Sequence, residues 1–328
     1  MRAGLKGSTT IKPKKKLITL LSLIVFFSGS PYGASAIYGG TESINNRIVV
    51  GLLGNQFSTV AGCSGGLVAP QVVFTAAHCV YGSGAIWVAA PGSDLRDLKT
   101  TRIESKAIYL PKDFTTATFP YKNDFAVILL KSKFSDASIV PIATSSQIFE
   151  WINNSAEVMH VGYGCTKLVD SPPCGVTSPI PNQFSTTLVN EIPPQFASLT
   201  PGTFSMTRIA VEKTICGGDS GSPLLKNVNG TWIYLGAQSS SNGAGCTKTC
   251  NTNCVASQGL ASSNTDLIQQ IASYLEIAKT EPTPTPSTSG SSTSTNSKKQ
   301  STIRCIKGKA VKKITAIDPK CPKGYKKK

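Results

Sequence analysis

Short apolar runs separated by turn-forming residues dominate the chain between residue 37 and about residue 264. Val, Ile, Leu and Phe occur in stretches of a few residues, and clusters of Gly, Pro, Asn and Ser interrupt them. This spacing is typical of β-strands joined by turns. The strongest strand candidates are residues 47–53, 66–74, 85–89, 125–130, 158–163 and 231–237. The pattern predicts an all-β domain with few helices.

One segment near the end of this domain departs from the strand pattern. Apolar residues recur near helical spacing across residues 264–279, behind an Asn or Thr cap. Asp266 stands in the first turn, where the helix dipole favours an acidic residue. We expect one helix over this segment to close the domain.

The first 36 residues predict a secretory signal peptide. They contain a basic stretch, an apolar run over residues 17–27 and the small-residue cleavage site Ala34-Ser35-Ala36. The alternative is an uncleaved anchor, but eleven residues are fewer than the ~20 that a membrane-crossing helix needs. No other segment is apolar enough to span a bilayer. We therefore expect a secreted, extracellular protein with no transmembrane segment in the mature chain.

The chain beyond residue 279 has a different composition. Residues 280–301 are almost entirely Thr, Ser and Pro, which predicts a flexible linker that buries no core. Residues 302–328 form a Lys-rich segment with Cys305 and Cys321 near its ends, and these two cysteines are expected to pair. The sequence therefore divides into a signal peptide, a domain over residues 37–279, a linker and a small basic segment.

The positive charge is concentrated at the two ends of the chain. The formal charge is +16, of which residues 1–36 carry +6 and residues 298–328 carry +11, so the body between them is close to neutral at −1. A near-neutral body argues against a specific nucleic-acid partner, because phosphate binding requires a basic face.

The ten cysteines agree with an oxidising destination, where disulfides persist. Their spacings do not resemble a zinc site, and His160, one of only two histidines, is interpreted as structural. We therefore predict disulfides, and neither a metal nor a cofactor.

The first candidate for chemistry is His78, in the segment Thr75-Ala76-Ala77-His78-Cys79 that follows an apolar run. An imidazole with a pKa near neutrality can take a proton from a hydroxyl and return it to a leaving group. A bridge between Cys63 and Cys79 would pin the loop that holds this ring. The alternative is a structural histidine beside a structural disulfide.

The second candidate is Asp124, immediately before the apolar run of residues 125–130. A carboxylate buried beside an imidazole fixes the tautomer of the ring and stabilises the imidazolium. By itself an aspartate before a strand is more often a turn residue.

The third candidate is Ser220, in the segment Cys-Gly-Gly-Asp-Ser-Gly-Ser-Pro at residues 216–223. Glycines on both sides allow a sharp backbone turn and let a substrate carbonyl approach the amides of Gly218 and Ser220. These amides would form an oxyanion hole. The alternative is a loop of no chemical consequence, which the order His, Asp, Ser of the three segments argues against.

With these segments the chain resembles the chymotrypsin/trypsin family over residues 37–279. The resemblance implies two packed six-stranded antiparallel β-barrels with His78, Asp124 and Ser220 in the cleft between them. It also implies a serine endopeptidase that acts on protein or peptide substrates through an acyl-enzyme intermediate. It further suggests that Cys165 pairs with Cys174 and that Cys216 pairs with Cys246, whereas the partners of Cys250 and Cys254 stay open.

The resemblance also implies an activation mechanism. Ile37-Tyr38-Gly39-Gly40 resembles the family's new N-terminus, whose α-ammonium pairs with the acid before the nucleophile, here Asp219. A competing start lies at Arg47-Ile48, but Ile37 stands at the family-like distance ahead of Cys63. Because Ile37 directly follows Ala36, removal of the signal peptide would itself expose the activating amine, and the protease would be active when secreted.

The substrate pocket is expected, by resemblance, to have Thr214 at its base, where trypsin-like enzymes carry an aspartate. No Asp or Glu occurs between Gly221 and Thr265 to replace it, and burying a basic side chain without a partner is costly. We therefore expect a neutral residue before the cleaved bond. Ser239 and Ser241 would lie on the substrate-binding strand, and the size preference stays open.

Residues 302–328 weakly resemble basic, two-cysteine terminal segments of some secreted bacterial proteins. They are interpreted as a module that attaches to an anionic cell-surface polymer or to lipid headgroups. A solvated tail is the alternative. Two rivals exist for the whole protein. One is a catalytically silent binding or adhesion protein with the same fold, and the other is a binder of nucleic acid or a heparin-like polymer that acts through its basic ends.

Overall fold

The computed structural model describes residues 37–166, 177–209, 213–242 and 254–276, and residues 301–307, 310–316, 321 and 325–327 near the C-terminus. The chain divides into two compact units, residues 1–280 and residues 281–328. The predicted signal peptide and most of the predicted linker lie outside the described residues.

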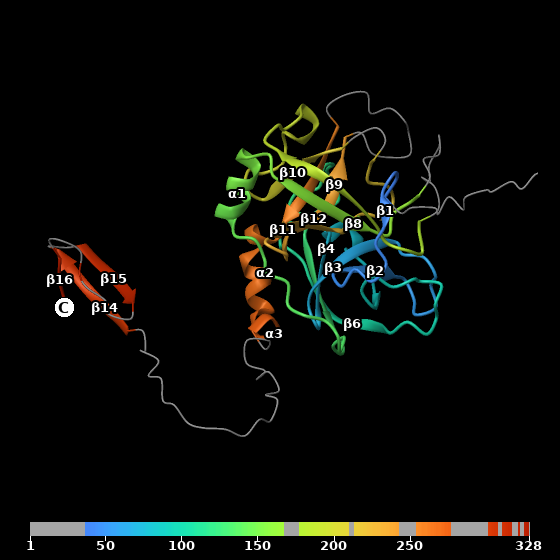
Figure 1. The fold of residues 1–328 in the computed structure, drawn as a ribbon, viewed down its shortest axis with the longest axis horizontal. Coiled ribbons are helices and arrows are strands. Elements are labelled where there is room, and N and C mark those ends of the chain that lie inside the picture. Colours follow the sequence, from blue (N-terminus) through green and yellow to red (C-terminus); the bar gives the residue numbers. More distant parts are fainter. Residues whose placement is uncertain are drawn as a thin grey trace, which may run out of the picture. The chain divides into compact units, whose positions relative to one another are not determined.

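Six antiparallel strands of the first unit close into a barrel in the order β2-β3-β4-β7-β6-β5 (Figure 1). These strands are β2 (Val49–Leu53), β3 (Cys63–Ala69), β4 (Val72–Thr75), β5 (Trp87–Ala89), β6 (Arg102–Tyr109) and β7 (Ala126–Leu130). β2, β4 and β7 are buried along their whole length, as the continuous apolar runs in the sequence predict.

The other strands of this unit form a sheet in the order β1-β9-β10-β13-β12-β11-β8, and β8 also pairs with β9. That last pairing closes six of these strands into a second barrel. They are β8 (Glu157–Gly162), β9 (Asn182–Val189), β10 (Phe204–Arg208), β11 (Pro223–Val228), β12 (Thr231–Ser241) and β13 (Val255–Leu260), and β1 (Thr41–Glu42) is added at β9. The prediction of two six-stranded antiparallel barrels is therefore confirmed.

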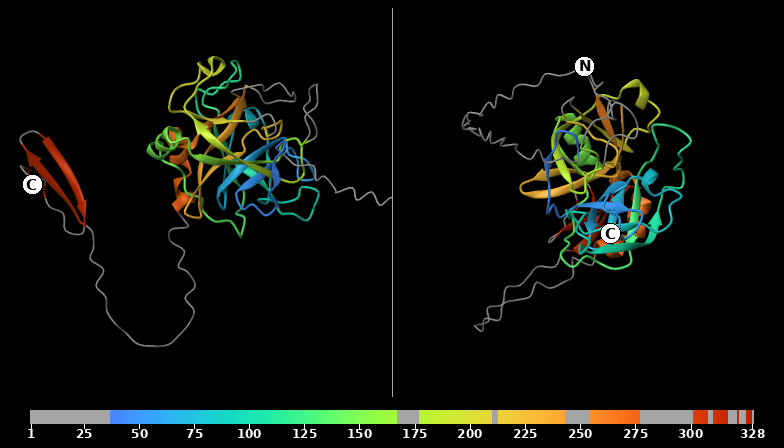
Figure 2. Two further views of the ribbon diagram at one scale, coloured as in Figure 1. Left: turned by 45° about the horizontal axis from the view of Figure 1, so that its top comes forward. Right: turned by 90° about the vertical axis from the view of Figure 1, so that its right-hand side faces the viewer.

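An apolar layer joins the two barrels, which lie side by side in both views of Figure 2. Phe74 of β4 contacts Phe125 edge to face, with ring centroids 5.1 Å apart, and contacts Tyr234 of β12 in the same way at 5.3 Å. All three side chains are completely buried. The close packing of these rings makes the strand ends at this junction rigid, and the loops extend from those ends.

The predicted strand over residues 66–74 is wrong in one respect, because it spans two strands. β3 ends at Ala69 and β4 begins at Val72, and the two pair with each other as a hairpin. Pro70 lies at the turn between them. Proline has no N–H to donate to a strand ladder, which gives the physical reason for the break.

The helices also differ from the prediction. The sequence pattern did not indicate α1 (Ser145–Asn153), which is capped by Thr144 and Gln147 in a reciprocal capping box. The predicted closing helix is two short helices, α2 (Thr265–Gln270) and α3 (Ala272–Glu276), and residues 277–279 lie outside the described residues. The break falls at Ile271, whose side chain is completely buried. The described residues also include the short 3-10 helices η1 (Ala77–Cys79), η2 (Pro194–Phe196) and η3 (Ala261–Ser263).

The second unit contains a three-stranded antiparallel sheet in the order β15-β14-β16. Its strands are β14 (Ser301–Lys307), β15 (Ala310–Ala316) and β16 (Lys326–Lys327). A disulfide joins Cys305 to Cys321, with Cα atoms 5.6 Å apart. Across the described parts of the whole chain, no helix has the length and hydrophobicity that a membrane crossing requires.

Candidate active site

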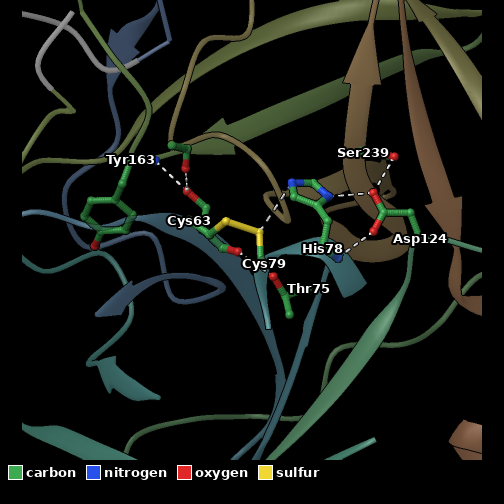
Figure 3. The surroundings of a disulfide bond; sticks show 9 residues. Cys63, Thr75, His78, Cys79, Asp124, Tyr163 and Ser239 are labelled. Atoms are coloured by element: carbon green, nitrogen blue, oxygen red, sulfur yellow. Dashed lines mark hydrogen bonds and ion pairs between the residues drawn. A yellow bond between two sulfur atoms is a disulfide. The ribbon is translucent and has the colours of Figure 1, made fainter. Parts of the chain in front are cut away.

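His78 lies in the short helix η1, directly after the buried strand β4. The next residue, Cys79, forms a disulfide with Cys63 at the start of β3, with Cα atoms 6.1 Å apart. This bridge ties the histidine loop to the neighbouring strand of the same barrel. Figure 3 shows the imidazole between the disulfide and Asp124.

Asp124 lies next to His78 because β7, which begins two residues later, pairs with β4. Its carboxylate is almost completely buried, at 2% exposure. Oδ2 lies 2.7 Å from Nδ1 of His78, Oδ1 accepts the backbone N–H of His78 at 2.9 Å, and Ser239 Oγ donates to Oδ2 at 2.6 Å (Figure 3). A carboxylate at Nδ1 requires a proton on that nitrogen, so Nε2 is left to act as the base.

The backbone of Ser220 is bonded to strand β3 of the first barrel. The N–H of Ser64, on β3, donates to the carbonyl of Ser220 at 2.8 Å. Gly221 packs so closely against Thr75 and Ala76 that a Cβ atom would not fit. Among the hydrogen bonds of the described residues, none joins the Ser220 hydroxyl to His78. Such bonds are often long before substrate binds, so the triad stays a prediction.

The backbone around Ser220 leaves two amides unused. Among the described residues, neither the N–H of Gly218 nor that of Ser220 donates a hydrogen bond within the chain. Gly218 has φ +95°, and a Cβ atom there would lie only 2.7 Å from Thr177 Cγ2. This position therefore requires glycine. The two amides are free to bind an oxygen that carries developing negative charge.

Asp219 points away from these amides into the interior. It is completely buried, and its carboxylate accepts the N–H groups of Gly164 and Cys216, each at 2.8 Å. Gly162 and Gly164 pack directly against this carboxylate and leave no room for a Cβ atom. Burial raises the pKa of Asp219 to about 7, and the two backbone hydrogen bonds oppose that rise.

The segment at Ile37 approaches the same region of the second barrel. The Ile37 side chain is completely buried in a cluster with Ile215 and Ala256. Tyr38 forms an antiparallel bridge with Thr214, and the N–H of Thr214 donates to Tyr38 O at 3.1 Å. The competing position Ile48, in contrast, is buried directly before β2 of the first barrel.

The comparison with known protein families agrees with this arrangement. A sequence model of the trypsin family matches residues 37–257, which is more than half of the chain. The chain belongs to the trypsin family.

A solved structure from the same fold is the secreted serine protease VesC from Vibrio cholerae. It superposes on this trypsin-family chain with a TM-score of 0.55 at 20% sequence identity. The alignment covers 70% of this chain and 47% of VesC, so this chain spans less than half of that protein. At this level of identity the likeness shows the shared fold.

The residues expected at the substrate pocket have different environments within the trypsin-family fold. Thr214 is buried, and its hydroxyl donates to Ile215 O at 3.3 Å. Ser239 directs its hydroxyl to Asp124, so this group supports the acid rather than facing a substrate side chain. Ser241 lies opposite Ala256 in the pairing of β12 with β13. The adjoining segment, residues 243–253, lies outside the described residues.

Two predicted disulfide pairings are wrong. Cys165 pairs with Cys216, and not with Cys174, and Cys216 is therefore not available to Cys246. The reason lies in the backbone: Cys165 N donates to Gly217 O at 2.9 Å, which brings the two Cα atoms to 5.4 Å. That separation suits a disulfide. Cys254 is also disulfide-bonded. Cys174, Cys246 and Cys250 lie outside the described residues.

His160 is buried in the second barrel, away from the other histidine. Its ring stacks on Phe184, and Nε2 lies 3.0 Å from Thr207 Oγ1. Burial lowers the pKa of His160 to about 3, so the ring is neutral at ordinary pH.

Within the described residues, the one cluster of metal-type ligands is Cys63, His78 and Cys79. Both sulfurs of that cluster form a disulfide and offer no thiolate, so we assign no metal to it.

Sequence reasoning missed one residue of the site, Ser64. It is completely buried on β3 and bonds to the serine loop through both its backbone and its side chain. A serine directly after Cys63 carries no pattern that would have singled it out.

Proposed function

We propose that this protein is a secreted serine endopeptidase, with His78, Asp124 and Ser220 as its catalytic triad. The observation that carries the proposal is the buried Asp124 carboxylate, which binds both Nδ1 and the backbone N–H of His78. This arrangement holds the imidazole in one orientation and one tautomer, as a general base requires. Ser220, in the adjoining loop, supplies the nucleophile.

The reaction follows from these positions. The Ser220 hydroxyl attacks the peptide carbonyl while His78 Nε2 takes its proton, and Asp124 stabilises the imidazolium. The amides of Gly218 and Ser220 bind the oxyanion of the tetrahedral intermediate. His78 then gives its proton to the leaving amine, which leaves an acyl-enzyme at Ser220. Water, deprotonated by His78, releases the acid and restores the serine.

Labelling with a fluorophosphonate probe tests this proposal on the full chain. We expect covalent capture at Ser220 that Ser220→Ala abolishes and His78→Ala strongly reduces. Ser222→Ala is the matched control, because this buried neighbour has a hydroxyl with no hydrogen-bond partner among the described residues. It should keep full labelling. A folded wild-type protein that is not labelled would favour the catalytically silent binding or adhesion protein.

We further propose that the α-ammonium of Ile37, freed by cleavage after Ala36, pairs with Asp219. The support is the buried position of Ile37, the bridge between Tyr38 and Thr214, and the Asp219 carboxylate, whose pKa burial raises. N-terminal sequencing of the secreted protein should begin at Ile37. A start well beyond Ile37 would refute this mechanism.

The substrate preference is proposed from Thr214. Its buried hydroxyl offers no counterion for a basic side chain, and a charged group without a partner is costly to bury. We expect cleavage of a peptide mixture after neutral residues. Dominant cleavage after Arg or Lys would show that the pocket has been misplaced.

For the C-terminal unit we propose attachment to an anionic cell-surface polymer. Arg304, Lys326 and Lys327 are exposed on a sheet that a disulfide stabilises. Such attraction weakens as salt screens it. Salt should therefore release the full chain from cells, and a shortened chain ending at Lys279 should not bind. Equal binding of both forms would favour the solvated tail.

A further inference from the structure

Ser64 uses every polar atom to connect parts of the active site. Its N–H donates to Ser220 O at 2.8 Å, and its carbonyl accepts the Thr75 hydroxyl at 2.8 Å. Its own hydroxyl donates to Gly218 O at 2.8 Å and accepts the N–H of Tyr163 at 2.9 Å. The residue is completely buried, so water does not compete for these bonds.

The position of Ser64 makes it a link between the two barrels. It lies on β3 of the first barrel, directly after Cys63, whose disulfide holds the loop of His78. Gly218, Ser220 and Tyr163 all belong to the second barrel or its loops. One buried side chain therefore connects the strand beside the general base to the loop that carries the nucleophile.

The backbone geometry explains what the hydroxyl adds. Gly217 O accepts Cys165 N–H at 2.9 Å, and because a trans peptide is planar, this bond directs the N–H of Gly218 the opposite way. Gly217 and Gly218 have the widest choice of backbone angles, so the hydrogen bonds around them decide their conformation. The next peptide plane is held on both sides: the Ser64 hydroxyl donates to Gly218 O, and the N–H of Asp219 donates to Cys216 O at 3.0 Å. Both peptide planes around the Gly218 amide are then fixed.

The bond between the Ser64 backbone and Ser220 would form with any residue except proline at position 64. The hydroxyl is different, because it both donates to Gly218 and accepts from Tyr163, which an apolar side chain cannot do. A merely structural hydroxyl would satisfy nearby backbone groups without affecting the reaction. Here its acceptor belongs to a residue whose amide is an expected oxyanion donor.

We propose that Ser64 is a positioning residue whose hydroxyl aims the Gly218 amide at the oxyanion. The proposal rests on the serine endopeptidase function proposed above. It assigns Ser64 no contact with substrate. The hydroxyl holds the oxyanion donor in place before the substrate binds. It therefore stabilises the transition state more strongly than the bound substrate.

The test is Ser64→Ala in the full chain, with active sites counted by fluorophosphonate titration. Loss of an oxyanion donor costs about 100- to 1,000-fold in kcat, so loosening one should cost about 10-fold while KM changes little. Affinity for a peptide aldehyde, which forms an oxyanion on Ser220, should fall in parallel with kcat. Affinity for an uncleaved peptide product should not.

The matched control is Ser205→Ala. Ser205 is also buried, and its hydroxyl donates to Gln258 Oε1 at 3.1 Å, away from the serine loop. Both variants should lower Tm, and only Ser64→Ala should lower kcat and aldehyde affinity. If Ser64→Ala does not fold, Ser64→Thr is compared with Ser64→Val, which differ only in the hydroxyl, and Thr should be about 10-fold more active.

Unchanged kcat and aldehyde affinity in Ser64→Ala would overturn the proposal, as would equal activity of the Thr and Val variants. A general fold defect would lower the titrated fraction of active sites without changing kcat per site, and this result would also overturn it. Failure of the proposed function is a different result: the wild-type protein would then not react with the fluorophosphonate.

Discussion

The two barrels of this protein share a topology and differ in what fills them. The first barrel encloses a mostly apolar cluster that includes Val50, Leu67, Val73 and Ile128. The second contains buried polar groups that bond to one another: Thr207 Oγ1 lies 3.0 Å from both His160 Nε2 and Gln258 Nε2. One barrel is stabilised largely by packing without directional demands, and the other also depends on correctly oriented donors and acceptors.

This difference extends to the active site. The positions of His78 and Asp124 are set by the pairing of the apolar strands β4 and β7 in the first barrel. The loop of Ser220 is instead fixed by hydrogen bonds that Ser64 and Cys165 donate and by one that the buried Asp219 carboxylate accepts. We therefore expect the first barrel to tolerate small core changes, and the second to respond to changes of charge and hydrogen bonding. Four predictions test this contrast.

The largest effect is expected at Asp124, which both barrels hold. Asp124→Asn keeps the shape but places an amide against His78, which favours the wrong tautomer and should lower kcat about 10⁴-fold with little change in Tm. The measurement is peptidase kcat per titrated active site. Ser239→Ala removes one of the three bonds to Asp124 and should cost at most about 100-fold. An equal loss in both variants would show that the second barrel controls this acid.

The next effect is the acid sensitivity of the second barrel through His160. Its pKa is lowered from 6.5 to about 3 by burial, so the unfolded chain binds a proton more readily than the folded one. The free energy of unfolding is therefore unaffected by His160 above pH 6.5. It falls as the pH drops toward 3, by at most about 5 kcal/mol. His160→Gln should flatten the fall of Tm between pH 7 and pH 4. An unchanged slope would count against this prediction.

Asp219 should give the opposite pH dependence when residue 36 is still attached to Ile37. Its pKa is raised from 3.8 to about 7, so the folded chain binds the proton more tightly. Stability is then greatest below pH 3.8 and is lost as the pH rises to 7, by at most about 4 kcal/mol.

Unfolding at pH 5 and pH 8 tests this in two forms of the protein, one beginning at Ile37 and one that retains Ala36. Cleavage should remove the dependence, because the new ammonium stabilises the carboxylate, and Asp219→Asn should remove it from the uncleaved form. The same slope in all three proteins would contradict the prediction.

The smallest effect is expected in the apolar interior of the first barrel. Ile128→Val removes one methylene group from a completely buried site and should cost about 1 kcal/mol of unfolding free energy. Activity per titrated active site should not change. Urea denaturation gives the free energy, and a drop in kcat of more than about 10-fold would mean that packing here positions His78 directly.

The sequence patterns predicted strands well where continuous burial produced apolar runs, as in residues 125–130, observed as β7. They were less informative where local chemistry decides. Pro70 splits one predicted strand, and the capping box of Thr144 and Gln147 begins a helix that the strand-like pattern did not indicate. Both features are visible in the sequence, but each depends on one or two residues and not on a repeating pattern.

The disulfides mark the limit of sequence reasoning. Cys63 and Cys79 are neighbours across a hairpin, and their pairing follows from local structure. The pairing of Cys165 with Cys216 spans 51 residues, and no spacing rule selects it. It depends on the contact between the segment at Cys165 and Gly217, which exists only in the closed second barrel.

The sequence by itself determined the β-rich fold and the candidates His78, Asp124 and Ser220. Buried strands require runs of apolar residues, and turns require residues such as Gly, Pro, Asn and Ser, so both can be recognised in the sequence. The tertiary structure decided which groups touch: Asp124 with Ser239, Asp219 with two amides, and Ser64 with the oxyanion loop. Apart from the local bond between Asp219 and Cys216, these contacts join residues far apart in the chain. Their geometry is set by how the two barrels close and pack, and no local pattern encodes it.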